Sequence, residues 1–126
     1  SEVLFVERIC EFLKPGTGKA AIVLPDGILT NSSSQYVRDF ILERFQLLAV
    51  VSLPQCAFAH FGAGVKASVI FVRKRDNNEV VNNEEAIFMA AELIGYDATG
   101  RKTESQLDEI VEQYKKFQED PAPFFI

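Results

Sequence analysis

The chain of 126 residues has no tryptophan, one histidine, one methionine and two cysteines. With His60 alone, a Ser-His-Asp triad or a histidine-rich metal centre has almost no raw material, so we interpret His60 as a loop or structural residue. Cys10 and Cys56 lie far apart in apolar surroundings, without zinc or redox spacing. They are therefore predicted to be buried free thiols.

Long hydrophobic runs are also absent. The longest, residues 20–25 and 47–53, are much shorter than the ~20 residues that cross a bilayer, and the N-terminal residues lack the basic-then-apolar pattern of a signal peptide. We expect a cytoplasmic protein without membrane contact. Seven glycines, five prolines and 48% hydrophobic residues argue against disorder and predict one globular domain over residues 1–126.

Familiar catalytic and cofactor motifs are missing as well. No G-x-G-x-x-G, G-x-S-x-G or C-x-x-C is present. Gly16-Thr-Gly18-Lys19 has a superficial likeness to a phosphate loop, but it follows a predicted helix and precedes a predicted strand, whereas a phosphate loop leads from strand to helix. From the residues alone, the chain is an α/β domain without a self-contained active site.

The net charge of −5 is unevenly distributed. Residues 1–75 carry nine Lys or Arg and six Asp or Glu, whereas residues 76–126 carry four and twelve. Local charge governs contact with phosphates. Residues 1–75 are therefore compatible with binding to nucleic acid, whereas residues 76–126 are not.

Hydrophobic periodicity predicts helices, and short apolar runs predict buried strands. The capping box Ser32-x-x-Gln35 starts one helix, and Ser105 is the expected N-cap of another. The strand–helix–strand unit over 20–53 predicts a parallel crossover, and its first strand is expected to be buried on both faces. The predicted elements are helix 3–13, strand 20–24 closed by a Pro-Asp-Gly turn, helix 32–45, strand 47–53, loop 54–65, strand 66–72, polar turn 76–85, strand 86–91, loop 95–101, helix 105–117 and an extended tail 120–126.

The 54–65 loop is long and aromatic, and loops of this kind often carry function. The rings of Phe58, His60 and Phe61 offer flat faces on which a base extruded from DNA could stack. Lys66 and the basic triplet 73–75 offer phosphate contacts. Two alternatives stay open: the phenylalanines fill the space under the loop, and the triplet is a solvated strand end.

Three segments carry a resemblance to a known family. Residues 19–29, 47–54 and 64–74, together with Phe58, resemble the modification (M) subunit of type I restriction-modification systems, and residues 94–101 resemble the segment after the catalytic sheet in that subunit. These subunits are S-adenosylmethionine-dependent N6-adenine DNA methyltransferases.

The resemblance implies a partial Rossmann-like methyltransferase sheet with flanking helices. Residues 20–74 would be the last three strands, the final one antiparallel between its neighbours. Residues 1–75 would end the catalytic sheet, and residues 76–126 would supply an added strand, a loop and an acidic C-terminal helix. The family's glycine-rich cofactor turn and Asn-Pro-Pro-Phe or -Tyr motif are absent here and are expected upstream of Ser1. No catalytic, cofactor-binding or metal-binding residue is therefore expected in this chain.

The resemblance also assigns roles to individual residues. Phe58, with Phe61 in reserve, would stack on the flipped adenine. Apart from the resemblance, the basic residues themselves point to Lys66 and Arg73 as contacts with the DNA backbone. S-adenosylmethionine would serve the intact enzyme and would not bind this chain, which alone would be inactive. The expected partners are DNA and the specificity and restriction subunits, together with self-association through an exposed sheet edge.

Two further hypotheses stay open. The chain could be an independent α/β module that binds a protein partner without catalysis. It could also be a degenerate methyltransferase that binds DNA without modifying it.

Overall fold

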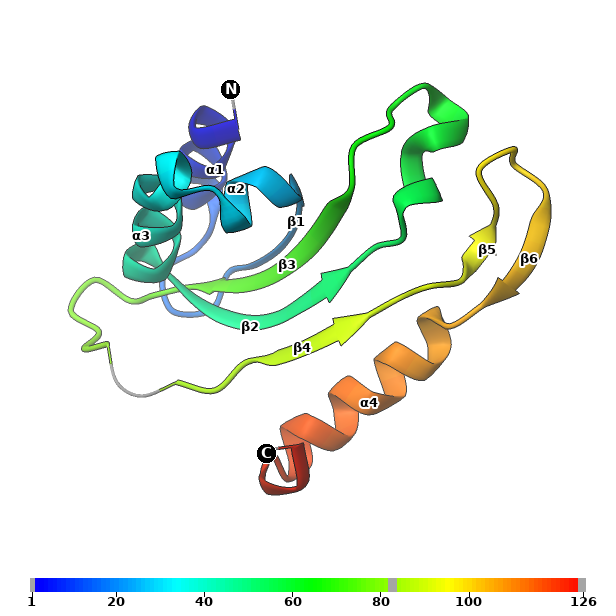
Figure 1. Ribbon diagram of the computed structural model, residues 1–126. Helices are drawn as coiled ribbons and strands as arrows, with labels where there is room; N and C mark the ends of the chain where they lie inside the picture. Colours follow the sequence, from blue (N-terminus) through cyan, green and yellow to red (C-terminus); the bar gives the residue numbers. More distant parts are fainter. Residues whose placement is uncertain (1, 82–83, 125–126) are drawn as a thin grey trace.

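The computed structural model describes residues 2–81 and 84–124 and confirms the α/β class (Figure 1). The polar turn predicted for 76–85 and the tail predicted for 120–126 lie partly outside these residues. The elements are α1 (Glu2–Phe12), β1 (Lys19–Pro25), α2 (Asp26–Thr30), the 3-10 helix η1 (Ser32–Ser34), α3 (Gln35–Arg44), β2 (Phe45–Ser52), the 3-10 helix η2 (Gln55–Phe61), β3 (Ala67–Lys74), β4 (Ile87–Ala90), β5 (Ile94–Tyr96), β6 (Lys102–Ser105), α4 (Leu107–Glu119) and the 3-10 helix η3 (Ala122–Phe124).

The main sheet has the strand order β1-β3-β2-β4. β3 runs antiparallel to both β1 and β2, and β4 runs parallel to β2. This confirms the order that the family resemblance implies. β1 and β2 are parallel, as the crossover prediction requires, but β3 lies between them. The carboxyl ends of β1, β2 and β4 consequently meet at one edge of the sheet.

Two hydrophobic cores lie on opposite faces of the sheet. In the first, α1 and α3 pack on β1, β2 and β3, with Phe45 fully buried; in the second, Phe117 of α4 packs on Ala49 and Ile87 (Figure 1). The register of β2 shifts at Leu48, which is left without a partner on β3. Because side chains alternate along a strand, this bulge lets Phe45 face the first core and Ala49 the second.

β1 corrects the expectation of a strand buried on both faces. Ile22 and Leu24 are buried in the first core, whereas Ala21 is exposed and Val23 is 50% exposed on the other face. The reason is the position of α4, which covers β4 and β2 rather than β1.

Several local predictions are wrong. Ser32–Ser34 forms a 3-10 turn, and α3 begins at Gln35 without a side-chain cap. The Pro-Asp-Gly turn is instead the start of α2. The loop 95–101 lies within an unpredicted hairpin, β5–β6, and part of the supposedly extended tail forms η3. The N-cap of α4 is Gln106 rather than Ser105.

The cysteine prediction is confirmed in part. Both cysteines are free; Cys10 is buried, whereas Cys56 is only half-buried. Within residues 2–81 and 84–124, no helix is long and apolar enough to cross a membrane.

Candidate functional site

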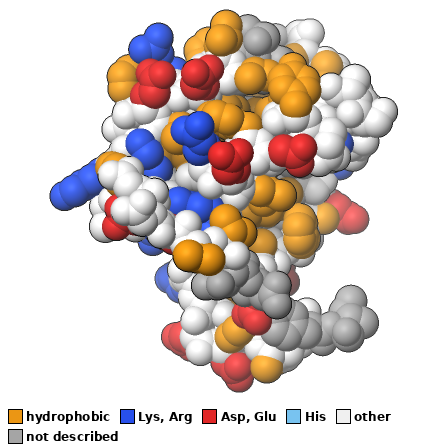
Figure 2. All heavy atoms as spheres, turned by 90° about the vertical axis from the view of Figure 1, so that its left-hand side faces the viewer, with side chains coloured by type: hydrophobic (Ala, Val, Ile, Leu, Met, Phe, Trp, Pro, Cys, Tyr) orange, Lys and Arg blue, Asp and Glu red, His pale blue; other side chains and the backbone are white. Residues whose placement is uncertain are grey.

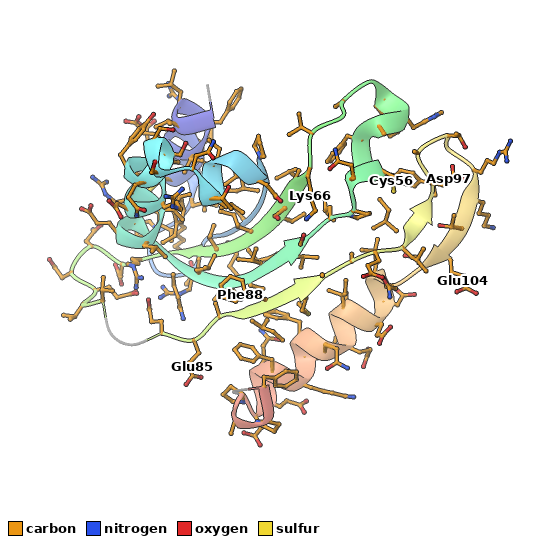
Figure 3. All side chains as sticks on the ribbon, viewed as in Figure 1. Cys56, Lys66, Glu85, Phe88, Asp97 and Glu104 are labelled. Atoms are coloured by element: carbon orange, nitrogen blue, oxygen red, sulfur yellow. The ribbon has the colours of Figure 1, made fainter. Side chains whose placement is uncertain are left out.

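The carboxyl edge of the sheet brings together most of the predicted site. β1 ends at Pro25 and β2 at Ser52, and β3 begins there at Ala67. Ligands of open α/β sheets bind outside the carboxyl ends of the strands. The loop that follows β2 places Phe58 and Phe61 at this edge. Lys66 lies at the end of this loop, directly before β3 (Figure 3).

The aromatic loop is ordered by its own hydrogen bonds. The Ala57 N–H donates to the Pro54 carbonyl at 3.0 Å, and the Gln55 side chain donates to the Gly64 carbonyl. Gly62 ends η2 with φ +87°, a conformation that favours glycine. Within this frame Phe58 is half-buried and Phe61 is 72% exposed. Of the two residues, Phe58 is therefore the less exposed.

Lys66 closes the base of the loop. Its Nζ donates to Ser52 Oγ at 2.7 Å and lies 3.4 Å from a carboxylate oxygen of Asp26. Ser68 Oγ donates to the other Asp26 oxygen at 3.0 Å. Asp26 thus ties the end of β1 to the start of β3. The Lys66 side chain nevertheless remains 43% exposed.

Arg73 lies at the other end of β3, away from Lys66. At about 3.3 Å per residue, a strand separates these two positions by more than 20 Å. The Arg73 guanidinium donates to Gln46 at 3.0 Å, to the Gly16 carbonyl at 2.9 Å and to Glu79 at 2.8 Å. The structure therefore does not bring Arg73 together with the aromatic loop.

Arg75 shows that a solvated strand end is the wrong interpretation for part of the basic triplet. Its residue surface is 6% exposed. Its guanidinium donates to Glu79 at 3.1 Å, to both Glu84 oxygens at 2.5 and 2.8 Å and twice to the Leu42 carbonyl. The hydrogen bond to Glu84 raises the pKa of Arg75 above its ordinary value. The side chain is thus a structural cation.

Glu79 provides a pH-dependent link between these arginines. The Arg73 hydrogen bond, assisted by the Asp76 N–H and Arg75, lowers the pKa of Glu79 from 4.5 to about 2. Because the pKa of Glu79 is lower in the folded protein than in the unfolded chain, its ionised carboxylate stabilises the fold at pH values above about 4.5. This stabilisation is lost as the pH falls from about 4.5 towards 2. We expect Glu79→Gln to flatten the acid side of the stability profile, measured by urea unfolding between pH 3 and 6. The exposed control Glu112→Gln should leave it unchanged, and identical profiles for both variants would contradict this expectation.

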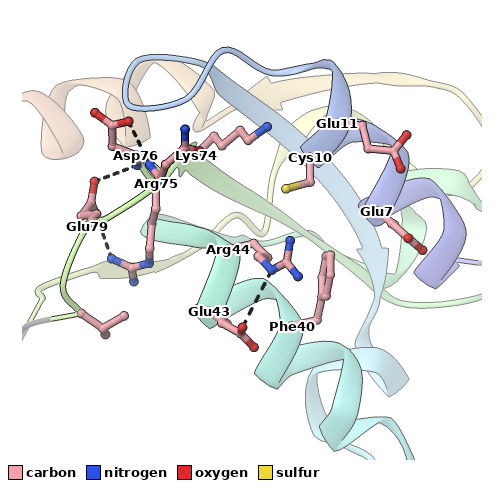
Figure 4. A pocket seen from close by; sticks show the side chains of 12 residues that line it. Glu7, Cys10, Glu11, Phe40, Glu43, Arg44, Lys74, Arg75, Asp76 and Glu79 are labelled. Carbon is pink, nitrogen blue, oxygen red and sulfur yellow. Dashed lines mark hydrogen bonds and ion pairs between the residues drawn. The ribbon is translucent and has the colours of Figure 1, made fainter.

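A hollow of about 550 Å³ lies beside these arginines rather than at the carboxyl edge (Figure 4). Its rim is mixed in charge, with Glu7, Glu11 and Asp76 facing Arg44 and Lys74. Figure 2 shows acidic, basic and apolar side chains interleaved on this side of the molecule. The described residues on this face therefore do not form a continuous basic patch.

Sequence reasoning missed the β5–β6 hairpin beside the loop. Tyr96 Oη donates to the Ala57 carbonyl at 2.7 Å, which joins the hairpin to η2. At the hairpin tip, Asp97 accepts hydrogen bonds from Thr99 and the Arg101 N–H; the Thr99 hydroxyl is the main reason that the pKa of Asp97 is lowered. Gly95 and Gly100 adopt φ +100° and +85° there, a conformation that favours glycine.

Gly16-Thr-Gly18-Lys19 connects α1 to β1, as expected, and is not a phosphate loop. A Cβ at Gly18 would lie 2.7 Å from the backbone nitrogen of Lys14. In the described part of the chain, no group of three or more His, Cys, Asp or Glu is placed to hold a metal ion.

Comparison with known proteins decides the family. The sequence model for N-6 DNA methylases matches residues 1–124. The chain belongs to the N-6 DNA methylase family. Two curated members, the methylase subunits of the type I restriction enzymes EcoKI of Escherichia coli strain K12 and StySJI of Salmonella typhimurium, are each 32% identical over 74 residues. This match covers 58% of the present chain and only 13% of either relative.

Solved structures agree with this N-6 DNA methylase assignment. The type I restriction-modification methyltransferase subunit of Streptococcus thermophilus is 26% identical with a TM-score of 0.66, over 90% of this chain and 23% of its own. A chain from a study of type I complex assembly and conformational transition is 26% identical with a TM-score of 0.64, over 98% and 24%. A class I S-adenosylmethionine-dependent methyltransferase of Listeria monocytogenes, 18% identical with a TM-score of 0.58 over 88% and 31%, shares the fold.

In the described residues, no glycine-rich turn, the feature that the family resemblance assigns to S-adenosylmethionine, follows β1, β2 or β4. After β1, the Asp26 N–H donates to the Lys66 carbonyl, and a Cβ at Gly27 would lie 3.2 Å from the Asn31 side-chain nitrogen. After β2, Pro54 has no N–H to offer. Asp26 and Pro54 thus offer no free backbone N–H to the cofactor's carboxylate.

Proposed function

We propose that this chain forms the target-base side of an N6-adenine DNA methyltransferase of a type I restriction-modification system. The observation that carries the proposal is the position of η2, an aromatic loop at the carboxyl edge of an N-6 DNA methylase sheet. S-adenosylmethionine is then held by residues outside those described.

In this proposal Phe58 stacks on the extruded adenine, and Phe61 is the second candidate for that wall. Stacking of a base on an aromatic ring contributes about 1–3 kcal/mol. Phe58 is half-buried, whereas Phe61 is 72% exposed. The chain thus contributes the position of the base rather than proton transfer.

Lys66 is the proposed phosphate contact beside the loop, because its side chain is 43% exposed at the same edge. Arg73 is the other candidate for a backbone contact. The Arg73 side chain is only 20% exposed, against 43% for Lys66, so exposure favours Lys66.

The proposed partners are DNA and the specificity and restriction subunits of a type I complex. A solved relative comes from a study of the assembly of such a system. We also propose that the chain by itself self-associates through β1. In the described chain β1 pairs only with β3, and its Val23 is exposed. An unpaired apolar edge favours pairing with another strand.

The test uses the methyltransferase that contains this chain. Phe58→Leu and Phe61→Leu remove one ring each, and we expect the stacking residue to lower kcat/KM for adenine methylation by about 5- to 150-fold, the range of 1–3 kcal/mol. Phe88→Leu, which changes a ring 71% exposed on β4, should leave kcat/KM unchanged. 2-Aminopurine at the target position should lose fluorescence quenching only in the stacking variant.

Two experimental results would contradict the proposed function. If folded Phe58→Leu and Phe61→Leu proteins both methylate at the wild-type rate, neither phenylalanine of η2 stacks on the base. If the protein containing this chain binds a protein partner but never methylates DNA, the interaction-module hypothesis is supported instead.

A further inference from the structure

Two reciprocal hydrogen bonds join the β5–β6 hairpin to the aromatic loop. Tyr96 Oη donates to the Ala57 carbonyl at 2.7 Å, and the Cys56 thiol lies 3.9 Å from the Tyr96 carbonyl, to which it donates. Figure 3 shows Cys56 and the hairpin residue Asp97 as neighbours from the two elements. A segment distant in sequence therefore fixes the middle of η2.

Aromatic contacts fix the end of η2 in the same way. The Phe61 ring meets the Tyr96 ring edge to face, with centroids 6.4 Å apart and planes at 87°. The His60 ring also meets the Phe61 ring, with centroids 5.3 Å apart and planes at 75°. Such edge-to-face pairs have a preferred geometry, so Phe61 is oriented although it is largely exposed.

The tip of the hairpin also touches the loop. A Cβ at Gly100 would lie 2.7 Å from Cε1 of His60, which means that the hairpin backbone and this imidazole are in direct contact. Gly100 has φ +85°, and the Asp97 hydrogen bonds hold that turn in place. The hairpin thus contacts η2 at Ala57, at Phe61 and at His60.

The sheet holds only the base of the loop. There Lys66 binds Ser52, and the Leu53 N–H donates to the Ala67 carbonyl at 3.0 Å. We propose that the β5–β6 hairpin sets the position of η2 and its aromatic side chains, with Tyr96 as the positioning residue. That this position serves a target base rests on the proposed function.

Hydrogen exchange on the chain tests the placement directly. The amide protons of Gly62 and Ala63 donate to the Ala59 and Phe58 carbonyls at 3.1 and 3.0 Å and report on the order of η2. Tyr96→Phe should accelerate their exchange about fivefold, the factor expected for one intramolecular hydrogen bond. The matched control is Tyr36→Phe, because the Tyr36 ring is 63% exposed on α3 and its hydroxyl has no hydrogen-bond partner among the described residues.

A second variant tests the same contact from the other side. Gly100→Ala should clash with His60 and accelerate exchange in η2, and His60→Ala should reverse this part of the effect. Gly95→Ala is the matched control, because Gly95 also has positive φ in this hairpin but its nearest outside atom would be 3.9 Å from the new Cβ. Wild-type exchange in both Tyr96→Phe and Gly100→Ala would overturn the inference.

Methylation kinetics separate the inference from the proposed function. If Tyr96 acts through η2, Tyr96→Phe should lower kcat/KM in the wild-type protein and have no further effect once the stacking ring is gone. If the Phe58→Leu and Phe61→Leu proteins retain full activity while exchange still responds to Tyr96→Phe, base stacking fails and the placement of η2 by the hairpin stands.

Discussion

Arg75→Met is expected to lower the free energy of unfolding by about 3 kcal/mol, because it leaves two carboxylates and a carbonyl without their buried partner. Glu79, Glu84 and the Leu42 oxygen all accept hydrogen bonds from this guanidinium. Methionine has most of the side-chain volume of arginine, so the loss in the free energy of unfolding reports on the missing charge. Urea unfolding at neutral pH measures it.

Arg44→Met is the control for Arg75→Met. The Arg44 side chain is 56% exposed, and its contact with Glu43 is 3.9 Å long. An exposed pair of this kind contributes about 0–1 kcal/mol. Equal losses in the two variants would show that the Arg75 cluster does not stabilise the fold.

Phe45→Ala is expected to cost about 3–5 kcal/mol, the range for removing a fully buried aromatic side chain. Phe45 has no exposed surface and begins β2 directly after Arg44, the last residue of α3. Its ring therefore packs at a junction where helix and sheet meet without a connecting loop. The loss is large against the total stability of about 5–15 kcal/mol that is typical of a domain.

Thermal and urea unfolding of the same variant check this expectation. The matched control is Phe12→Ala, because Phe12 is 79% exposed on α1. A surface change of this kind should stay within about 0.5 kcal/mol. A small loss for Phe45→Ala would mean that the first core rearranges to fill the cavity.

The sequence predicts the four main strands because buried strands need nearly continuous apolar side chains. The four main strands β1 to β4 correspond to the apolar runs 20–24, 47–53, 66–72 and 86–91. The predicted ends of these runs lie within about two residues of the observed ends. The order of these strands in the sheet cannot be predicted in the same way. Spacing alone predicts a crossover but not the insertion of β3, which only the family resemblance implies.

The elements that were missed are held by contacts distant in sequence. β6 spans Lys102–Ser105 with mostly exposed side chains, so no apolar pattern marks it. The Tyr96 hydroxyl reaches an acceptor 39 positions away. Likewise, Ser32 and Gln35 have the spacing of a capping box, yet the chain forms a 3-10 turn there, because local signals do not record tertiary packing.

Part of the candidate site can likewise be predicted from the sequence, and part of it cannot. Phe58, Phe61 and Lys66 can be placed together from the sequence, because the strand that begins after the loop starts beside Lys66. Arg73 is grouped with Lys66 on the ground that both flank one strand, although an extended strand carries its two ends apart. The burial of Arg75 depends on Glu79 and Glu84, and no pattern in the sequence links these three residues in advance.

The insertion of β3 also dictates when the sheet can assemble. β1 and β2 do not pair with each other; β1 makes its backbone bonds to β3, as in the pairs Lys19 with Arg73 and Pro25 with Ala67. As the chain leaves the ribosome, β1 must therefore wait for some forty further residues before its partner emerges. Pairing over such a separation is slow, and during that interval the apolar residues of β1 depend on α1 and α3 for cover.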